Sequence, residues 1–268
     1  MKHLFDYIIS LREKGEFCFT SSQALKALNV SQDALRMSLV RMRNKKQIVT
    51  LYKRFHLIIP PEYRSIGCLP ADHFIFAYMK FLELDYYVCL LSAARYYGAE
   101  HQKSQIFQVM TTKQLKVVKC GKVTVQFIYK KNIKNIPINI FDVPTGYINV
   151  STPEVTTMDL LRYQKRSGGI NHIATVLTEL IASIDPKKLL QLVQASDEIV
   201  WVQRLGYILE QLNPIETKNW QKSIDLLKKF VKKKSPAYTL LVNDGDDEST
   251  AKDADWKIIV NYKIESDI

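Results

Sequence analysis

The sequence predicts an α+β protein with two domains, a small one over residues 1–64 and a larger one over residues 65–268. Three observations support this prediction. The chain has 268 residues with 47% hydrophobic content, which exceeds the common size of one domain and is enough for a sizeable core. Helical spacing of apolar residues dominates the N-terminal part, whereas short β-rich segments dominate residues 104–150. Helix-start signals then recur from residue 151 onward.

Three helices are expected in the small domain. Apolar residues at helical spacing define the first one, before Gly15 (Leu4, Phe5, Ile8, Ile9 and Leu11). Hydroxyl side chains at residues 20–22 can cap a second helix, which ends at Asn29. Ser31 can cap a third helix that reaches about Arg43. The inward stripe of this third helix is Leu35, Leu39 and Met42.

The other faces of the third helix carry side chains that suit DNA, since glutamine can pair with adenine and arginine with guanine. Two short strands, residues 48–50 and 55–59, then flank a turn and complete a winged helix-turn-helix. Residues 31–54 hold seven basic side chains and one acidic one, a local balance of +6. The residues predicted to bind DNA are Ser31, Gln32, Arg36, Arg41, Arg43, Lys45, Lys46, Lys53 and Arg54. The alternative is a solvated basic face on a small helical domain.

Adjacent prolines, Pro60 and Pro61, and a glycine, Gly67, mark the expected boundary between the domains. The segment that follows is rich in aromatic residues and is predicted to be helical up to Gly98, including residues 86–97. Its tyrosines could stack on bases. Packing of the helix onto a sheet is the favoured interpretation, because aromatic side chains commonly serve that purpose.

Five short β-rich segments predict the sheet of the larger domain: residues 106–110, 115–118, 123–129, 138–141 and 147–150. Most of the turns between them are too short for helical crossovers, so the sheet is expected to be mainly antiparallel. Seven lysines lie on these strands and turns: Lys113, Lys116, Lys119, Lys122, Lys130, Lys131 and Lys134. They could form a basic face, and they could equally protect the sheet edges from aggregation.

A helical C-terminal part is predicted after the sheet. Cap-plus-proline signals at residues 152–153 and 185–186 mark two of its helix starts. Four helices are expected at residues 153–166, 170–184, 187–194 and 197–212, and a lysine-rich fifth at residues 216–233. Lys228, Lys229, Lys232 and Lys233 of that helix are predicted to form a basic surface for an acidic partner; the alternative is a solubility face. Two strands, residues 238–242 and 256–262, enclose an acidic segment, residues 244–248, whose role is open.

Cysteine spacing and hydropathy bear on the compartment. Cys18, Cys68, Cys89 and Cys120 form no C-x-x-C pair, so no zinc site is expected, and each is predicted to be a free, buried thiol in a reducing cytoplasm. No apolar stretch reaches 18 residues, and the first residues are too interrupted by charge for a signal peptide. We therefore expect a soluble, cytoplasmic protein without membrane association. Its net charge of +11 is typical of proteins that meet polyanions.

Three stretches of the chain carry a family resemblance. They are the winged helix-turn-helix ending in LIIPPEYRSIGCLP, then YYVCLLSAARYYGAEHQKSQIFQVMTTK, and then VSTPEVTTMDLLRYQKRSGGINHIATVLTEL continued by VQRLGYILEQL. Together they resemble the antitoxins of AbiE-type abortive-infection systems, which are type IV toxin–antitoxin modules of bacteria. The resemblance implies autorepression by binding of inverted repeats in the promoter. It also implies a C-terminal domain that neutralises a nucleotidyltransferase-like toxin without a stable complex.

The chain departs from many of these relatives at the wing turn, Tyr52 to Phe55, where they have a glycine. No enzyme motif of the P-loop, H-E-x-x-H, G-x-S-x-G or G-x-G-x-x-G type occurs. A metal-dependent nuclease would have to use Asp142, Glu154 and Lys165, whose spacing is poor. No catalysis, metal or cofactor is therefore predicted. The second candidate function is a winged-helix regulator that senses a small ligand through its C-terminal domain and has no toxin partner.

Overall fold

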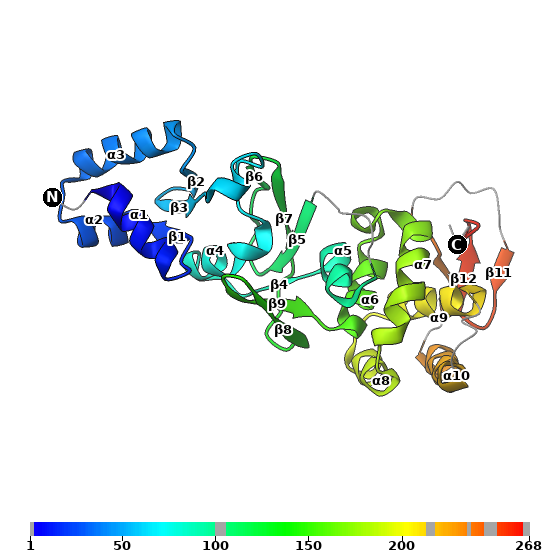
Figure 1. Cartoon of the computed structure of the whole chain (residues 1–268). Coiled ribbons are helices and arrows are strands. Elements are labelled where there is room, and N and C mark those ends of the chain that lie inside the picture. Colours follow the sequence, from blue (N-terminus) through cyan, green and yellow to red (C-terminus); the bar gives the residue numbers. More distant parts are fainter. Residues whose placement is uncertain (1–2, 100–105, 213–217, 235–236, 244–250, 265–268) are drawn as a thin grey trace. The chain divides into compact units, whose positions relative to one another are not determined.

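The computed structural model describes residues 3–99, 106–212, 218–234, 237–243 and 251–264 (Figure 1). The chain divides into two compact units, each assembled from two stretches of sequence. Unit 1 comprises residues 1–88 and 104–150, and unit 2 comprises residues 89–103 and 151–268. Helices and strands occur in both, so the predicted α+β class is confirmed. Residues 1–64 lie within unit 1 together with the larger sheet, and their independence as a domain stays a prediction.

Unit 1 begins with the three predicted helices, α1 (Leu4–Glu13), α2 (Ser21–Leu28) and α3 (Gln32–Asn44). Thr20 caps α2, since its hydroxyl accepts from the Gln23 amide while the Gln23 side chain accepts from the Thr20 amide. Asn29 ends α2 in a left-handed conformation, with φ of 51°. The predicted helix-turn-helix geometry thus follows from local capping.

A three-stranded sheet in the order β1-β3-β2 completes this region. The predicted hairpin is formed by β2 (Ile48–Tyr52) and β3 (Phe55–Ile58), and β1 (Cys18–Thr20) is a strand that was not predicted. Its three residues are too few to show a period-2 pattern. At the wing turn, Arg54 adopts a φ of 67°, a left-handed conformation that glycine would adopt without strain. The turn therefore forms without the glycine of many relatives.

The helices and this sheet share one apolar core. Its buried members are Leu4, Ile8, Leu11, Phe19, Ala24, Leu28, Leu35, Leu39, Met42, Ile48 and Ile58. They include the whole predicted inward stripe of α3, so one face of that helix is fixed against the core and the opposite face remains exposed.

The larger sheet of unit 1 has six strands in the order β6-β7-β5-β4-β9-β8. They are β4 (Tyr86–Val88), β5 (Ile106–Thr111), β6 (Val118–Cys120), β7 (Val123–Tyr129), β8 (Ile138–Val143) and β9 (Gly146–Ser151). The pairs β4–β5 and β6–β7 are antiparallel, whereas β5–β7 and β4–β9 are parallel. The prediction of a mainly antiparallel sheet was therefore too simple. Because β6 folds to the outer edge as the hairpin partner of β7, β7 returns beside β5 in the same direction.

The aromatic segment before this sheet corrects a second prediction. A helix, α4 (Ile75–Phe81), forms in its first half, but residues 86–88 are the strand β4 rather than part of a helix. The three side chains of β4 are buried, and the strand pairs with β5 and β9 in the middle of the sheet. Aromatic and β-branched residues suit such a site, and pairing partners distant in sequence decide the outcome. The strand predicted at residues 115–118 also begins later, at Val118.

Two cysteines correct a third prediction. Cys68 and Cys120 form a disulfide with Cα atoms 5.6 Å apart, although 52 residues separate them in sequence. Gly121 allows the close approach, because a Cβ at that position would overlap the backbone of Ile66 and Gly67. Cys18 keeps its thiol, and burial raises the pKa of that group to about 12. The prediction of four free thiols was wrong, and the argument for a reducing compartment loses that support.

Unit 2 contains the predicted helices of the C-terminal part. They are α6 (Pro153–Arg162), α7 (Gly169–Leu180), α8 (Pro186–Ala195), α9 (Val200–Leu212) and α10 (Lys218–Lys234), joined by α5 (Leu90–Ala94) from the earlier stretch. A small sheet in the order β10-β12-β11 follows: β10 (Thr239–Leu240), β11 (Ala251–Asp253) and β12 (Ile258–Val260). The strand β11 was not predicted. The acidic segment, residues 244–248, lies outside the described residues.

Buried polar side chains of α9 form hydrogen bonds to the backbone of the small sheet and its connecting segment. Arg204 of α9 donates from its Nε and Nη2 atoms to the Leu240 carbonyl, at 3.1 and 3.0 Å. Gln203 donates to the carbonyls of Trp256 and Lys257, at 3.1 and 3.0 Å. The ring of Trp256 is fully buried and lies directly against Gly206. These contacts fix the C-terminal strands to the helical layer of unit 2.

Candidate nucleic-acid interface

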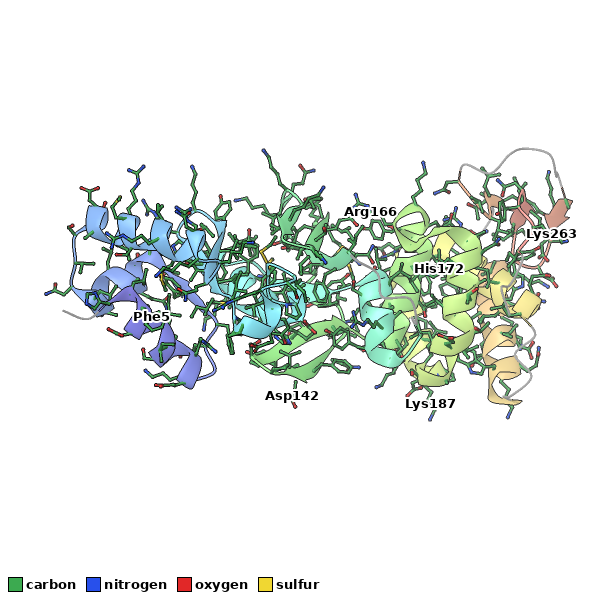
Figure 2. All side chains as sticks on the ribbon, turned by 45° about the horizontal axis from the view of Figure 1, so that its top comes forward. Phe5, Asp142, Arg166, His172, Lys187 and Lys263 are labelled. Carbon is green, nitrogen blue, oxygen red and sulfur yellow. A yellow bond between two sulfur atoms is a disulfide. The ribbon has the colours of Figure 1, made fainter. Side chains whose placement is uncertain are left out.

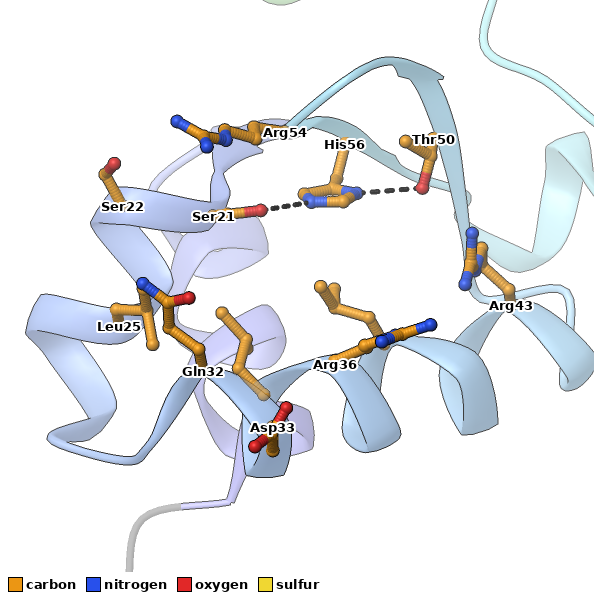
Figure 3. A pocket seen from close by; sticks show the side chains of 12 residues that line it. Ser21, Ser22, Leu25, Gln32, Asp33, Arg36, Arg43, Thr50, Arg54 and His56 are labelled. Carbon is orange, nitrogen blue, oxygen red and sulfur yellow. Dashed lines mark hydrogen bonds between the residues drawn. The ribbon is translucent and has the colours of Figure 1, made fainter.

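A hollow of about 420 Å³ opens between α3, the start of α2 and the β2–β3 hairpin (Figure 3). Its lining residues are Ser21, Ser22, Leu25, Gln32, Asp33, Leu35, Arg36, Leu39, Arg43, Thr50, Arg54 and His56. Three of them are arginines and one is an acid. The hollow is therefore cationic on a surface that also offers hydroxyl and amide groups.

The structure brings four of the nine predicted DNA-binding residues together in this hollow: Gln32, Arg36, Arg43 and Arg54. The other basic residues, Arg41, Lys45, Lys46 and Lys53, are exposed but do not line it. Lys46 lines a neighbouring hollow of about 400 Å³ together with Arg43 and Arg64. Ser31 instead caps α3, since its hydroxyl accepts a hydrogen bond from the Ala34 amide at 3.2 Å. The hollow thus brings together three of the predicted arginines, from α3 and the wing turn.

Sequence reasoning missed four polar residues of the hollow: Ser21, Ser22, Thr50 and His56. His56 is only 4% exposed, and its Nε2 and Nδ1 atoms lie 2.9 Å from Ser21 Oγ and 3.0 Å from Thr50 Oγ1. Its ring also packs on Phe19, with centroids 5.1 Å apart. Burial and the nearby Arg43 charge lower the pKa of His56 to about 4, so the imidazole is neutral at pH 7. A single histidine among five scattered ones gave no signal of this arrangement.

The predicted lysine surface of α10 divides into two pairs. Lys228 forms ion pairs with Glu210 and Asp255, at 2.7 and 2.9 Å, and Lys232 pairs with Asp255 at 2.8 Å. The hydrogen bonds from these lysines hold the pKa of the Asp255 carboxyl at about 2. Lys229 and Lys233 are exposed. Part of the charge of α10 is thus neutralised within unit 2, and Lys229 and Lys233 contribute to its outward positive charge.

The candidate nuclease residues are divided between the two units. Asp142 projects outward from β8 in unit 1 (Figure 2), whereas Glu154 is buried in unit 2 and accepts from the Asp185 amide at 2.9 Å. Lys165 is an exposed residue of unit 2. Within the described part of the chain, no group of three or more histidine, cysteine, aspartate or glutamate side chains could hold a metal ion.

Comparison with known proteins identifies the region that follows the winged helix. Residues 86–211, from β4 through most of α9, match the family model of the AbiEi antitoxin C-terminal domain. The chain carries an AbiEi antitoxin domain. The resemblance to AbiE-type antitoxins is thereby confirmed, and the domain supports an antitoxin role in a toxin–antitoxin system. No curated protein matches the sequence.

Among solved structures, the crystal structure of the RV2827C protein from Mycobacterium tuberculosis has the same fold as this AbiEi-domain protein. Its TM-score is 0.62 at 14% identity, and the match covers 94% of this chain and 89% of that one. The solution structure of the antibiotic-resistance factor ANT(2'')-Ia matches at 12% identity over 46% of this chain and 87% of that one. Its TM-score of 0.31 is too low to support any argument. Across the described ranges, no helix is both long and apolar enough to span a bilayer.

Proposed function

We propose that this AbiEi-type antitoxin binds the DNA of its own promoter through α3 and the β2–β3 turn, and thereby represses its own synthesis. The observation that carries this proposal is the hollow of Arg36, Arg43 and Arg54 beside the exposed face of α3. An α-helix fits the major groove of B-form DNA, and a wing can then contact the neighbouring backbone. The protein would act in the bacterial cytoplasm, where its promoter lies.

The basic and polar residues divide into two roles. Gln32 and Arg36 lie in the first turns of α3, where recognition helices commonly meet base edges. Lys45, Lys46 and Lys53 flank α3 and the wing turn, and their ammonium groups suit backbone phosphates. Inverted repeats, which the family resemblance implies, would place one copy of the chain on each half-site.

Fluorescence anisotropy with a labelled duplex from the region upstream of the gene tests this proposal. The double variant Arg36→Ala/Arg41→Ala should lose most of its affinity, and the affinity of the wild type should fall steeply as salt rises. Lys187→Ala is the matched control, because Lys187 is an exposed basic residue of α8 in unit 2 (Figure 2). Equal affinity of the double variant and the control at moderate salt would refute the assignment.

We further propose that unit 2 neutralises a nucleotidyltransferase-like toxin through its surface, without forming a stable complex. Lys229 and Lys233 are exposed residues of α10 that suit an acidic toxin surface or competition for the toxin's nucleic-acid substrate. The full-length variant Lys229→Glu/Lys233→Glu should fail to rescue cells from the product of the neighbouring toxin gene. The Arg36→Ala/Arg41→Ala variant should rescue them fully.

Two results would count against this division of labour. Rescue that depends on Arg36 and Arg41 would assign neutralisation to the DNA-binding region, and unimpaired rescue by the reversed-lysine variant would remove α10 from the mechanism. If the wild-type protein rescues no cells, a regulator without a toxin partner is the better description.

A further inference from the structure

His56 lies at the base of the arginine-lined hollow, where it joins two elements of the winged helix-turn-helix. The residue belongs to β3, and its ring nitrogens contact the hydroxyls of Ser21, the first residue of α2, and Thr50, in β2 (Figure 3). Both hydroxyls line the hollow together with His56, whose side chain is almost entirely buried. The ring therefore sets the positions of two hydroxyl groups on a surface that solvent and ligands can reach.

Hydrogen-bond directions follow from the protonation state of this ring. A neutral imidazole has one N–H donor and one acceptor nitrogen. One of the two hydroxyls must therefore accept from the ring, and its own proton is then available to a further acceptor. The other hydroxyl donates to the ring. In either tautomer, His56 leaves one hydroxyl proton, that of Ser21 or of Thr50, for an acceptor outside the pair.

The charged groups around the hollow select the kind of acceptor. Arg36 and Arg43 reach it from α3, and Arg54 reaches it from the wing turn. Asp33, in the first turn of α3, is the single acid among its lining residues, so the lining has a balance of +2. Guanidinium groups bind phosphate oxygens through paired N–H donors, and hydroxyls add neutral donors to the same oxygens. An oxyanion with several acceptor oxygens fits this set of donors.

We propose that this hollow is a subsite for one phosphate group of the DNA backbone, and that His56 is the positioning residue that holds the hydroxyls of Ser21 and Thr50 so that one of them donates to that phosphate. This inference rests on the proposed DNA-binding function. A strand of the duplex that passes between α3 in the major groove and the wing would cross the hollow. Arg36, Arg43 and Arg54 then contact the phosphate directly, and His56 acts through the two hydroxyls.

Two substitutions of His56 distinguish a role in positioning the hydroxyls from a role in packing alone. His56→Phe keeps a ring of similar size against Phe19 but removes both hydrogen bonds, whereas His56→Gln keeps one donor and one acceptor. We expect His56→Phe to lower affinity for the upstream duplex about tenfold, and to leave the slope of log K against log salt nearly unchanged because the arginines of the hollow remain. His56→Gln should retain most of the affinity. Ser21→Ala/Thr50→Val should reproduce the effect of His56→Phe, and it keeps the test valid if His56→Phe does not fold.

A second measurement identifies the source of the phosphate. The ring nitrogens of His56 are observed by ¹⁵N NMR in the full-length wild type during titration with inorganic phosphate, with sodium chloride at matched ionic strength as the reference. Shifts of these signals with phosphate and with the duplex, but not with chloride, support the subsite. Shifts with phosphate in a protein that binds no duplex would refute the DNA source and, with it, the proposed function. Duplex binding whose affinity is unchanged in His56→Phe and in Ser21→Ala/Thr50→Val would overturn this inference and leave the proposed function standing.

Discussion

Replacement of Gly206 by alanine should destabilise unit 2, because the ring of Trp256 occupies the space that a side chain would need. A Cβ at Gly206 would lie well under 3.0 Å from three atoms of the six-membered ring, and the ring is fully buried. Its indole nitrogen donates to Glu210 Oε2 at 2.6 Å, so the ring cannot move aside without loss of that hydrogen bond. The overlap must therefore be relieved by displacement of the C-terminal strands from α9.

Two opposing effects set the magnitude. Overpacking of a well-packed core typically costs about 1–3 kcal/mol. Alanine is favoured over glycine within a helix by about 1 kcal/mol, which reduces this cost. When the cost of overpacking lies in the upper part of its range, the free energy of unfolding falls by about 1–2 kcal/mol in total. For a unit of this size, 1 kcal/mol shifts the melting temperature by about 4 °C, so the expected decrease is about 4–8 °C.

Tryptophan fluorescence measures this decrease in unit 2 alone. The three tryptophans of the chain are Trp201, Trp220 and Trp256, and all lie in the second stretch of unit 2. The matched background is Trp256→Leu, in which the ring is absent and Gly206→Ala should be neutral or stabilising. An unchanged or raised melting temperature for Gly206→Ala in the wild-type background would refute the packing argument.

Three further predictions concern other parts of the chain. Arg54→Gly should stabilise unit 1 by about 1 kcal/mol, because glycine adopts the left-handed conformation of the wing turn without strain; chemical denaturation measures this effect. The same variant should bind the duplex more weakly in the anisotropy assay, because it lacks the arginine's positive charge. Lys228→Ala should lower the melting temperature of unit 2 more than Lys229→Ala, because Lys228 pairs with Glu210 and Asp255 whereas Lys229 is exposed. The folded-state pKa of Asp255 is depressed to about 2, so its contribution to stability is present above pH 3.8 and is lost as the pH falls towards 2. Melting temperatures between pH 5 and pH 2 should accordingly fall less in Asp255→Asn than in the wild type, and parallel curves would contradict this.

Local signals were sufficient for the helices of the DNA-binding region. Thr20 and Ser31 cap α2 and α3 by accepting hydrogen bonds from amides three positions further along the chain. Both partners of each hydrogen bond therefore lie within one short segment of the sequence. The inward stripe of α3 could be predicted for the same reason, since its 3.6-residue period is a property of one short segment.

Features that depend on distant partners could not be predicted. Tyr86 to Val88 became a strand because β5 and β9 lie on either side of it, and Cys68 met Cys120 because two glycines let their segments approach. Only part of the lining of the hollow could be predicted from the sequence. Its arginines were predicted from charge and helix position, whereas His56 joined them through contacts to Ser21 and Thr50, which lie 35 and 6 residues away.

The discontinuous make-up of both units has a consequence for biosynthesis. Unit 1 needs residues 104–150 and unit 2 needs residues 89–103 together with everything from residue 151 onward. During translation, neither unit can form all of its internal contacts when only its first stretch has left the ribosome. Residues 89–103 can pack only after the second stretch of unit 2 has been synthesised. A premature stop near residue 150 would leave a chain whose winged helix is complete but whose α5 lacks α6. Incomplete products of this gene would accordingly keep the groups proposed to contact the promoter while lacking residues 151–211 of the matched antitoxin domain.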